Sequence, residues 1–293
     1  MNFKRVLLAT DFSESAKELT NCIKELQPAG LTEVFLTHIV NTNKLFSLKD
    51  YSEQESVDRE KLIRTRNQIE TGLKNEKKQF EDFNLKVKTI VEVGPVADKL
   101  VEIAKEEDID LILIPSHSKS YLQNFLLGST TSDVIRISKV PVLVERYKEI
   151  TEEKIKTFPE NRFNKVLFPT DLSKGADKVF QQIKKAGQII KEVVILSVIE
   201  RNINQEQLER LVTSRKKNLL KLKEELEEEG IEVKAKIEAG DAVENILRMA
   251  QEEETTSIVM PTKGSGNIKG LLIGSTTNEV VRKSKRPILV FPS

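Results

Sequence analysis

Short apolar runs alternate with longer amphipathic stretches along the chain. The first run, Arg5–Ala9, ends at the polar pair Thr10-Asp11, and an amphipathic stretch follows from Ser13 to about Leu26. Apolar runs of four to eight residues predict buried strands, and apolar residues three and four positions apart predict helices. Ser13 stands where a helix N-cap belongs. The chain is therefore predicted to open with a strand, a loop and a helix.

The same alternation continues through the first half of the chain. We expect further strands at Glu33–Val40, Lys86–Glu92, Leu111–Ile114 and Val140–Glu145, and helices at Ser56–Phe83, at Val96–Glu107 and after Gly128. Alternating strands and helices imply a parallel sheet with right-handed crossovers and helices on both faces. The unbroken apolar run Leu111–Ile114 agrees with this, because a strand covered on both faces has no polar side.

The chain contains an internal repeat. Phe3–Ser13 recurs 160 residues later as Phe163–Ser173, with six of eleven positions identical, and Gly128–Thr131 recurs 146 residues later as Gly274–Thr277. Such self-similarity indicates repeated structural units. Each copy is therefore predicted to form its own doubly wound α/β domain, with five parallel strands and helices on both faces.

The domain boundaries follow from the repeat. The charged stretch Glu145–Arg162, which contains Pro159, separates the copies. We place the first domain at 1–146, a linker at 147–161 and the second domain at 162–293. In doubly wound sheets, ligands bind beyond the carboxyl ends of the strands, where the strand order reverses. The loops after the first and fourth strands of each copy should therefore face one crevice.

Composition excludes several classes of function. The chain has 47 basic and 46 acidic residues, a net charge of +1, so no overall field draws it to nucleic acid or anionic lipid. It has no apolar run of membrane-spanning length and no signal-peptide pattern, and we expect it in the cytoplasm. The single cysteine, Cys22, and two histidines form no recognisable metal site, and we predict that Cys22 is a small core residue.

The most informative stretch lies in the second copy. The apolar run Ile258–Met260 leads into a loop that contains Gly264, and Gly274-Ser275-Thr276 starts an amphipathic segment. Glycine lets the backbone approach a ligand closely, and a helix start offers unpaired, positively polarised N–H groups. A phosphate would suit this place. The alternative is that the glycines are ordinary turn residues and that Ser275 is only an N-cap.

The spacing resembles the nucleotide loop of the universal stress proteins: glycine, two residues, glycine, nine residues, glycine and then serine or threonine. Pro261, Gly264, Gly274 and Ser275 stand at these positions, with proline in place of the first glycine. The resemblance extends over both copies. It implies two tandem, Rossmann-like domains of the adenine-nucleotide alpha hydrolase type. Proline lacks an N–H, so any contact made by the family's first glycine amide is lost, and a rigid loop entry is the alternative role.

The resemblance also assigns ligand contacts. It implies that ATP or AMP, with magnesium carried on the phosphates as an option, binds mainly in the second copy, with Asp171 against the adenosine and the main chain at Val198 against the adenine. The expected contacts in that copy are Thr170, Asp171, Val198, Pro261, Thr262, Lys263, Gly264, Gly274, Ser275 and Thr276. Weaker counterparts in the first copy are Asp11, Ile39, Gly128, Ser129 and Thr130.

Alternatives stay open for single residues. Asp11 and Asp171 could instead bond loop amides, the threonines could satisfy local backbone groups, and Lys263 could be solvated. The copies also differ, because Gly264 and Gly266 correspond to Ser118 and Ser120. A serine side chain narrows the backbone approach and resists positive φ. The C-terminal site is therefore predicted to bind nucleotide better.

Three functions fit the sequence. The leading hypothesis is a stress-response or signalling protein that binds adenine nucleotide and is not an enzyme, with no catalytic residues, since no motif places an acid and base pair beside Asp171. The second is a structural or interaction scaffold with empty sites. The third is a slow ATP hydrolase. We expect neither nucleic acid nor membrane as partner.

The last strands of the two copies are apolar and would be exposed sheet edges if left alone. We therefore predict an internal pair of domains in which Val142–Val144 lies near Ile288–Val290. In the family that this chain resembles, separate domains commonly pair through these strands, so a homodimer is a further option. Because the linker joins the two domains, each meets the other at a high effective concentration, which favours pairing within the chain.

Overall fold

The computed structural model describes residues 1–41, 55–116, 127–150, 155–157, 161–199, 205–264 and 273–293. The strands are β1 (Arg5–Ala9), β2 (Glu33–Val40), β3 (Lys86–Val93), β4 (Leu111–Pro115), β5 (Val142–Glu145), β6 (Tyr147–Ile150), β7 (Ile155–Thr157), β8 (Lys165–Pro169), β9 (Glu192–Ile199), β10 (Glu232–Ala239), β11 (Ser257–Pro261) and β12 (Ile288–Phe291). The helices are α1 (Glu14–Leu26), α3 (Glu55–Lys77), α4 (Val96–Glu106), α5 (Ser129–Ile137), α6 (Lys174–Lys184), α7 (Gln205–Glu227), α8 (Ala242–Glu252) and α9 (Ser275–Lys283), with 3-10 turns at Gln27–Ala29 and Lys78–Phe83.

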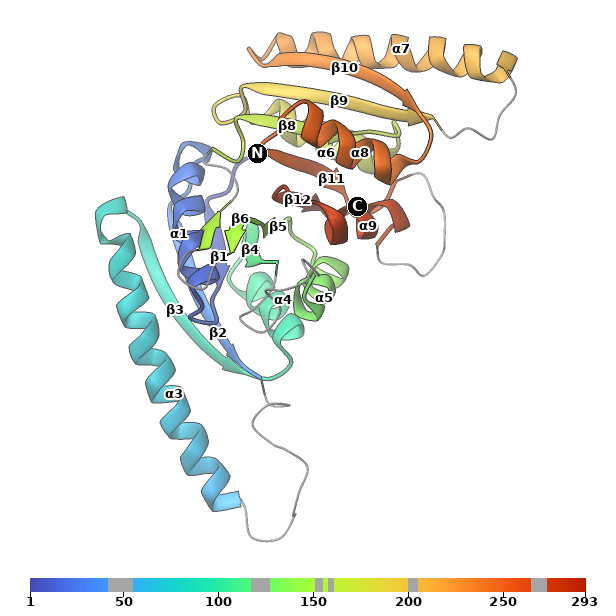
Figure 1. Ribbon diagram of the computed structural model, residues 1–293. Coiled ribbons are helices and arrows are strands. Elements are labelled where there is room, and N and C mark those ends of the chain that lie inside the picture. Colours follow the sequence, from blue (N-terminus) through green and yellow to red (C-terminus); the bar gives the residue numbers. More distant parts are fainter. Residues whose placement is uncertain (42–54, 117–126, 151–154, 158–160, 200–204, 265–272) are drawn as a thin grey trace.

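One sheet runs through both copies (Figure 1). It has ten strands in the order β10-β9-β8-β11-β12-β5-β4-β1-β2-β3, so each copy contributes five parallel strands in the doubly wound arrangement predicted from the repeat. The strand order reverses between β8 and β11 in the second copy and between β1 and β4 in the first. The loops after these strands therefore lie at the two positions where such sheets bind ligands.

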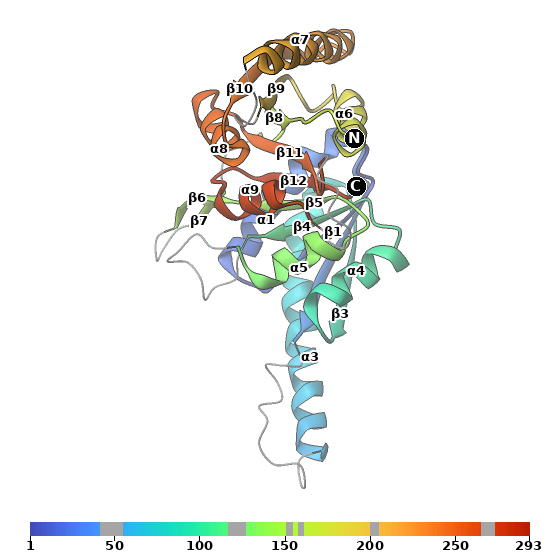
Figure 2. The same ribbon diagram turned by 90° about the vertical axis from the view of Figure 1, so that its right-hand side faces the viewer.

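Helices cover both faces of the sheet, as Figure 2 shows from the side. One core holds buried side chains of α1, α3, α6 and α7, and the other holds those of α4, α5, α8 and α9. Each core contains residues from both copies, so the apolar layers continue across the boundary between the domains. The strands are apolar on both sides because each strand side chain enters one of these two layers.

Two expected elements differ from their predicted bounds. The long helix expected over Ser56–Phe83 ends as an α-helix at Lys77 and continues as a 3-10 turn, which Asn84 terminates in the left-handed conformation with φ 53°. The last strand of the first copy begins two residues later than expected. The turn before this strand is held by the Ser138 hydroxyl, which accepts from the Val140 amide at 3.1 Å and donates to the Val140 carbonyl at 2.7 Å.

The two domains meet through their last strands. β12 pairs with β5 in the antiparallel sense, with Ile288 opposite Val144, Leu289 opposite Leu143 and Val290 opposite Val142. Every other neighbouring pair in the ten-stranded sheet is parallel. Val142–Val144 and Ile288–Val290 are thus neighbours, in the place where the sequence led us to expect them.

This register predicts a specific crosslink. Cysteines at Val144 and Ile288 should form a disulfide within one chain, because opposed residues of antiparallel strands have Cβ atoms about 4.5–5.5 Å apart. The matched control pairs Val144→Cys with Val290→Cys, which is two residues out of register. Mobility on a non-reducing gel reports the result. Crosslinks that form only between chains, or equally well in both pairs, would contradict the observed pairing.

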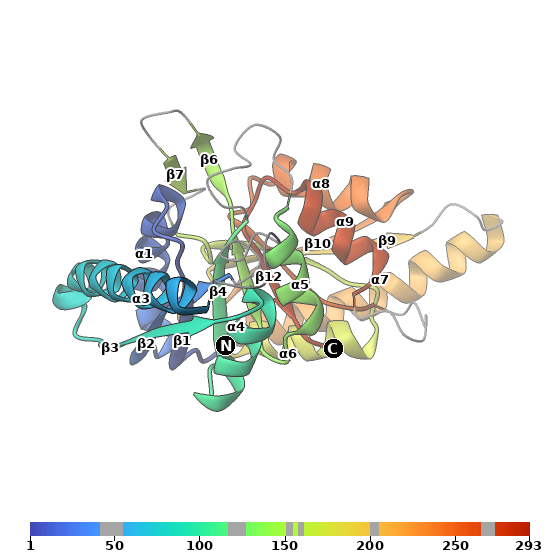
Figure 3. The ribbon, with the colours of Figure 1, turned by 90° about the horizontal axis from the view of Figure 1, so that it is seen from below.

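The linker forms a small hairpin, which the sequence pattern did not predict. β6 and β7 pair in the antiparallel sense, and β7 lies beside α1 (Figure 3). Pro159 lies outside the described residues. The described part of the linker therefore folds back on the first domain instead of crossing open space.

A buried polar cluster anchors the end of the linker. Glu145, fully buried at the end of β5, accepts from the Cys22 thiol at 2.8 Å and from Arg162 Nε. Arg162 is also fully buried, and its Nη1 donates to Glu25 at 2.5 Å. Cys22 is a buried core residue, as predicted, but its contact with a carboxylate was not foreseen. Together these groups join α1, β5 and the start of the second domain.

An ion network at the amino ends of the strands makes the stability of the fold depend on pH. Lys236, Lys234 and Lys165 surround Glu253, and the hydrogen bond from Lys236 is the main cause that lowers the pKa of Glu253 to about 2. A carboxylate with a lowered pKa stabilises the fold above its unfolded pKa of about 4.3, and that stabilisation disappears as pH falls towards 2.

We therefore expect Glu253→Gln to lower the free energy of unfolding by about 1 kcal/mol at pH 7, because the lysine partners are partly exposed. The difference from the parent protein should vanish near pH 2. Urea unfolding at a series of pH values measures it. Glu228→Gln, at the exposed residue directly after the end of α7, is a control for loss of one charge. A difference that stays constant from pH 7 to pH 2 would contradict this role.

Candidate functional site

The candidate site lies at the carboxyl ends of β8 and β11, which are neighbours in the sheet. The turn from Thr170 to Ser173 leaves β8 and starts α6. Thr262-Lys263-Gly264 leaves β11, and the chain returns at Gly274 to start α9. Residues 265–272 between them lie outside the described part of the chain. The crevice predicted from the repeat is thus framed by two loops and the amino end of one helix.

The turn after β8 is held by its own side chains. Thr170 Oγ1 accepts from the Leu172 amide at 3.0 Å, and Asp171 Oδ1 accepts from the Ser173 amide at 3.0 Å. Ser173 caps α6 by accepting from the Ala176 amide at 3.3 Å. Leu172 takes the left-handed conformation with φ 63°, which these bonds support. Thr170 and one oxygen of Asp171 therefore have the loop-bracing role kept above as an alternative.

The first copy repeats this turn atom for atom. Thr10 Oγ1 accepts from the Phe12 amide at 3.1 Å, and Asp11 Oδ1 accepts from the Ser13 amide at 3.0 Å. Ser13 caps α1 by accepting from the Ala16 amide at 3.2 Å, as predicted. Phe12 has φ 59°, the counterpart of Leu172. The Thr-Asp pair of each copy is thus part of a turn that aims the following helix.

Gly264 is required by close contact and not by backbone conformation. A Cβ atom added at Gly264 would lie 2.4 Å from Asp171 Oδ2. Its φ is outside the left-handed region, so the expectation of a positive φ is wrong for Gly264, and the close neighbour that favours glycine here is the Asp171 carboxylate. The structure does not describe Gly266. It also does not describe Ser118 and Ser120, the residues of the first copy that correspond to Gly264 and Gly266. Asp171 and Gly264 close one wall of the crevice together.

The loop after β11 is braced by a residue that sequence reasoning missed. Ser293 Oγ accepts from the Lys263 amide at 2.9 Å and lies 3.0 Å from Thr262 Oγ1. The Thr262 amide donates to the Phe291 carbonyl at 2.7 Å. Lys263 is half-buried. These bonds fix the main chain of the loop and leave the Lys263 side chain at its border.

A second glycine also escaped the sequence analysis. A Cβ atom added at Gly175, in the first turn of α6, would lie 2.5 Å from the Lys263 carbonyl oxygen. The amino end of α6 therefore approaches the β11 loop more closely than any other residue type allows. A signal was present, since glycine is unfavourable inside a helix and the repeat aligns Gly175 with Ser15.

The amino end of α9 offers donors to the crevice. Gly274 is the N-cap, its amide donates to the Thr262 carbonyl at 2.7 Å, and it provides no side-chain cap. Ser275 is therefore the first helical residue and not the N-cap. The Gly274 amide, expected to face phosphate, is already bonded. The donors that remain for a ligand are the first-turn amides, those of Ser275 and Thr276 among them.

Pro261 lies at the entry of the loop after β11. It is the last residue of β11, opposite Phe291, and its carbonyl accepts from Thr277 Oγ1 at 2.9 Å. Pro115 repeats this in the first copy, where its carbonyl accepts from Thr131 Oγ1 at 2.9 Å. The prolines therefore end the strands and the threonines tie the following helix to them.

The frame of the N-terminal crevice is similar. Gly128 is the N-cap of α5, and its amide donates to the Ser116 carbonyl at 2.8 Å. Ser129 and Thr130 start this helix, as Ser275 and Thr276 start α9. Ile39 is buried at the end of β2, whereas its counterpart Val198 is half-buried at the end of β9. The backbone alone does not separate the two sites.

Side chains make the two crevices different. In the first copy, the Phe12 ring stacks on His38 with 4.9 Å between centroids, and Thr10 Oγ1 donates to buried Glu76 at 3.1 Å. His38 Nδ1 lies 2.9 Å from the Thr10 carbonyl oxygen, and burial lowers the pKa of His38 although Thr10 and Asp11 act to raise it. The first copy thus fills this space with aromatic rings and a carboxylate.

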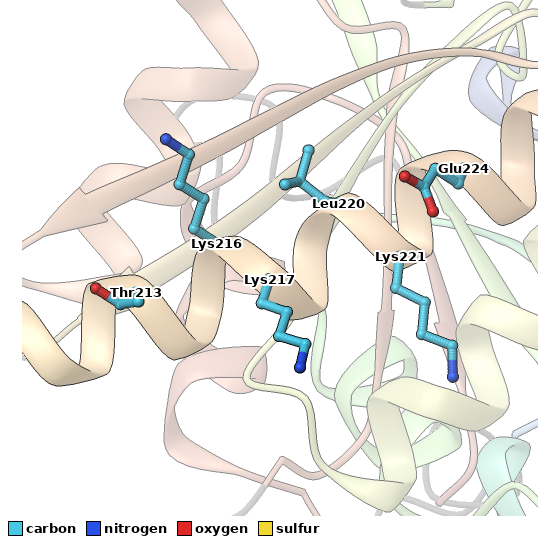
Figure 4. A pocket seen from close by; sticks show the side chains of 6 residues that line it. All are labelled: Thr213, Lys216, Lys217, Leu220, Lys221 and Glu224. Carbon is cyan, nitrogen blue, oxygen red and sulfur yellow. The ribbon is translucent and has the colours of Figure 1, made fainter.

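A shallow hollow of about 460 Å³ lies on the outer side of α7, away from the crevice (Figure 4). It is lined by Thr213, Lys216, Lys217, Leu220, Lys221 and Glu224. In Figure 4 these side chains fan out from a single helix. This surface has the character of a solvated charged face and takes no part in the candidate site.

Two properties of the described residues bear on other functions. Within those ranges, His, Cys, Asp and Glu side chains form no group of three that could hold a metal ion. Over the same part of the chain, no helix combines the length and the apolar character that crossing a membrane requires.

The fold and the repeated loops define a tandem, doubly wound α/β protein with a helix amino end at each switch point. The model of the universal stress protein family matches residues 2–146 and again residues 162–292, so the chain belongs to this family and contains two of its domains. Residues 147–161 separate the two matches.

Individual relatives agree with this assignment. The chain is 35% identical over 159 residues to universal stress protein MJ0577 of Methanocaldococcus jannaschii, an alignment that covers 50% of this chain and 96% of the relative. It is 25% identical over 208 residues to universal stress protein Slr1230 of Synechocystis, covering 70% and 65% of the two chains. The crystal structure of a universal stress protein from Archaeoglobus fulgidus shares the fold over 98% of this chain and 96% of that one, with TM-score 0.69 and 24% identity.

Proposed function

We propose that this chain binds one adenine nucleotide, ATP or AMP, in the crevice of its C-terminal half. The observation that carries the proposal is the first turn of α9, which has no side-chain cap and whose N-cap, Gly274, lies against the backbone of Thr262 and Gly264. Anions are stabilised at helix amino ends by free N–H groups and by the helix dipole.

The phosphates would lie against the amides of Ser275 and Thr276. Lys263 stands at the border of the same loop, where its charge can offset that of the phosphates, and the Ser293 bonds hold the loop in place before ligand arrives. Magnesium would come bound to the phosphates. The adenosine would extend towards Asp171 and Val198, as the family resemblance implies.

The N-terminal crevice should bind nucleotide weakly or not at all. Buried Glu76 sits beside Thr10 there, and a buried carboxylate opposes an anionic ligand. Phe12 and His38 stack at the end of β2, in the space next to Ile39 where the base would go. The difference between the copies thus lies in side chains that the loop motif does not include.

We further propose that the chain acts by binding and not by catalysis, as a stress-response or signalling protein whose partner choice depends on nucleotide. Asp171 supports this, since Oδ1 bonds the Ser173 amide and Oδ2 packs at Gly264, which suits a fixed wall better than a proton carrier. Phosphate release from ATP over many turnovers should equal the buffer blank. Release that depends on Asp171 would identify a slow hydrolase instead.

The pairing of β5 with β12 uses the last strand of both domains within one chain. We propose that this internal pair is the working unit, so that nucleotide binding does not require a homodimer. Sedimentation of the full chain with and without ATP tests this point.

Calorimetric titration of the full chain with ATP and magnesium tests the proposed function. We expect binding with a stoichiometry close to one nucleotide per chain. Two equal sites per chain would contradict the inequality of the copies. An absence of heat and of ligand retention at millimolar ATP would favour the scaffold hypothesis.

A further inference from the structure

Arg215 reaches the end of β9 from the middle of α7. Its Nη1 donates to Ser197 Oγ at 2.7 Å, and Ser197 is fully buried. Ser197 follows Leu196, which pairs with Pro169 of β8, so the guanidinium stands level with Thr170. Arg215 is half-buried. A cation is therefore held at the β9 side of the crevice, at the end opposite to the one where α9 begins.

The first copy has no cation at this position. The Thr170 amide donates to the Leu196 carbonyl, and in the first copy the Thr10 amide donates to the Thr37 carbonyl. Leu196 therefore corresponds to Thr37, and the next residue, Ser197, corresponds to His38. Leu73 and Leu219 are both buried, and their spacing of 146 residues is also the spacing of Lys86 and Glu232, which start the strands after these helices. The same offset aligns Arg215 with Ile69.

Three aligned positions thus differ together. Phe12, His38 and Ile69 of the first copy are replaced by Leu172, Ser197 and Arg215. The first set consists of an aromatic stack and a buried apolar side chain. The second set removes both rings and places a guanidinium, hydrogen-bonded to a hydroxyl, in their surroundings. The second copy, which has the glycine loop, thus lacks the aromatic stack and has the Arg215 guanidinium in the same region.

We propose that Arg215 is a ligand-binding residue of the C-terminal crevice and contacts the nucleoside half of the bound nucleotide. The inference rests on the proposed function. Arginine has five N–H donors in one plane, and Ser197 is the acceptor assigned to it among the described residues. The remaining donors and the flat cationic face suit the ring nitrogens, the ribose oxygens or the π face of adenine. Val198, beside Ser197, is where the resemblance puts the base.

Titrations of the full-length Arg215→Ala protein with AMP and with ATP test the proposal. A contact to the nucleoside half is shared by both ligands, so affinity for each should fall by the same factor, about ten-fold or more. Arg215→Lys keeps the charge without the planar donors and should lie between. Arg210→Ala is the matched control, because exposed Arg210 pairs with Glu206 on the same helix, and it should bind like the parent protein.

Three results would overturn the inference. Unchanged affinity in Arg215→Ala, with the parent protein binding normally, would remove Arg215 from the site and leave the proposed function intact. A loss for ATP with none for AMP would place Arg215 at the phosphate end. A parent protein that binds neither ligand would refute the proposed function together with this residue's role. Thermal melts of all variants exclude unfolding as the cause, and Arg215→Lys keeps the test valid if the alanine variant is unstable.

Discussion

Replacing Arg162 by methionine should lower the free energy of unfolding by about 3–5 kcal/mol at pH 7. Removal of the guanidinium leaves Glu145, which is fully buried, without its cationic partner. It also removes the side-chain bond to Glu25, which keeps only the bonds that it accepts from the main-chain amides of Arg162 at 2.7 Å and Asn161 at 3.0 Å. The cost arises because an unpaired carboxylate in the interior must stay charged without solvent or take up a proton.

The pH dependence of this loss identifies its cause. Burial already raises the pKa of Glu145, although Arg162 and the hydrogen bonds act to lower it. Without Arg162 the pKa should rise further. A carboxyl whose folded pKa is raised is accommodated at low pH and destabilises the fold as pH rises. The deficit of Arg162→Met should therefore be larger at pH 8 than at pH 5, as measured by urea unfolding.

A second change gives the matched control. Arg162→Met combined with Glu145→Leu removes both charges, and much of the lost stability should return, since buried ion pairs can often be replaced by apolar groups of similar volume. Equal stability of Arg162→Met and the parent protein would show that the cluster does not anchor the second domain.

Replacing Gly274 by valine should abolish nucleotide binding while the protein stays folded. Gly274 has φ −71° and ψ 150°, which valine adopts readily, so the strain expected from a positive φ does not arise. An added Cβ would lie 3.4 Å from the Thr262 carbonyl, an ordinary contact, and the two methyl groups would extend from it over the first turn of α9. Two lost contacts to a charged phosphate would reduce affinity by about 100-fold or more.

The first copy offers the control for this change. Gly128 has φ −63° and ψ 146° at the same point of its helix, so Gly128→Val is the same substitution in the same backbone conformation. Its binding should equal that of the parent protein. Ser275→Ala should cost less than Gly274→Val, because one hydroxyl is lost and the amides stay open. If Gly274→Val binds ATP normally with an unchanged melting temperature, the phosphates do not lie at α9.

Local patterns allowed much of the fold to be predicted. The apolar strands and the N-cap Ser13 depend on residues close in sequence, and the expected turn and helix formed there. The repeat carries the same turn to the second copy, where Ser173 caps α6. The parallel order followed because strand and helix alternate. The loop motif also marked residues that the fold brings together, since Asp171 and Gly264 meet at the carboxyl ends of β8 and β11.

The remaining features depend on contacts between distant residues. Arg162 meets Glu25 across 137 positions, and no local pattern marks this arginine as buried. Ser293 braces Lys263 across 30 positions. Phe12 was visible as a departure from Leu172, but its stacking on His38 depends on how β1 and β2 pair. Chemistry of this kind becomes visible only when the strands are placed side by side.

A crystal structure of the full chain grown with ATP and magnesium tests the central claim most directly. We predict nucleotide density in the C-terminal crevice, with phosphates against the first turn of α9, the base near Val198 and Arg215, and no nucleotide beside Phe12 and His38. Density in the N-terminal crevice with an empty C-terminal one, or phosphates bound away from the amides of Ser275 and Thr276, would contradict the account.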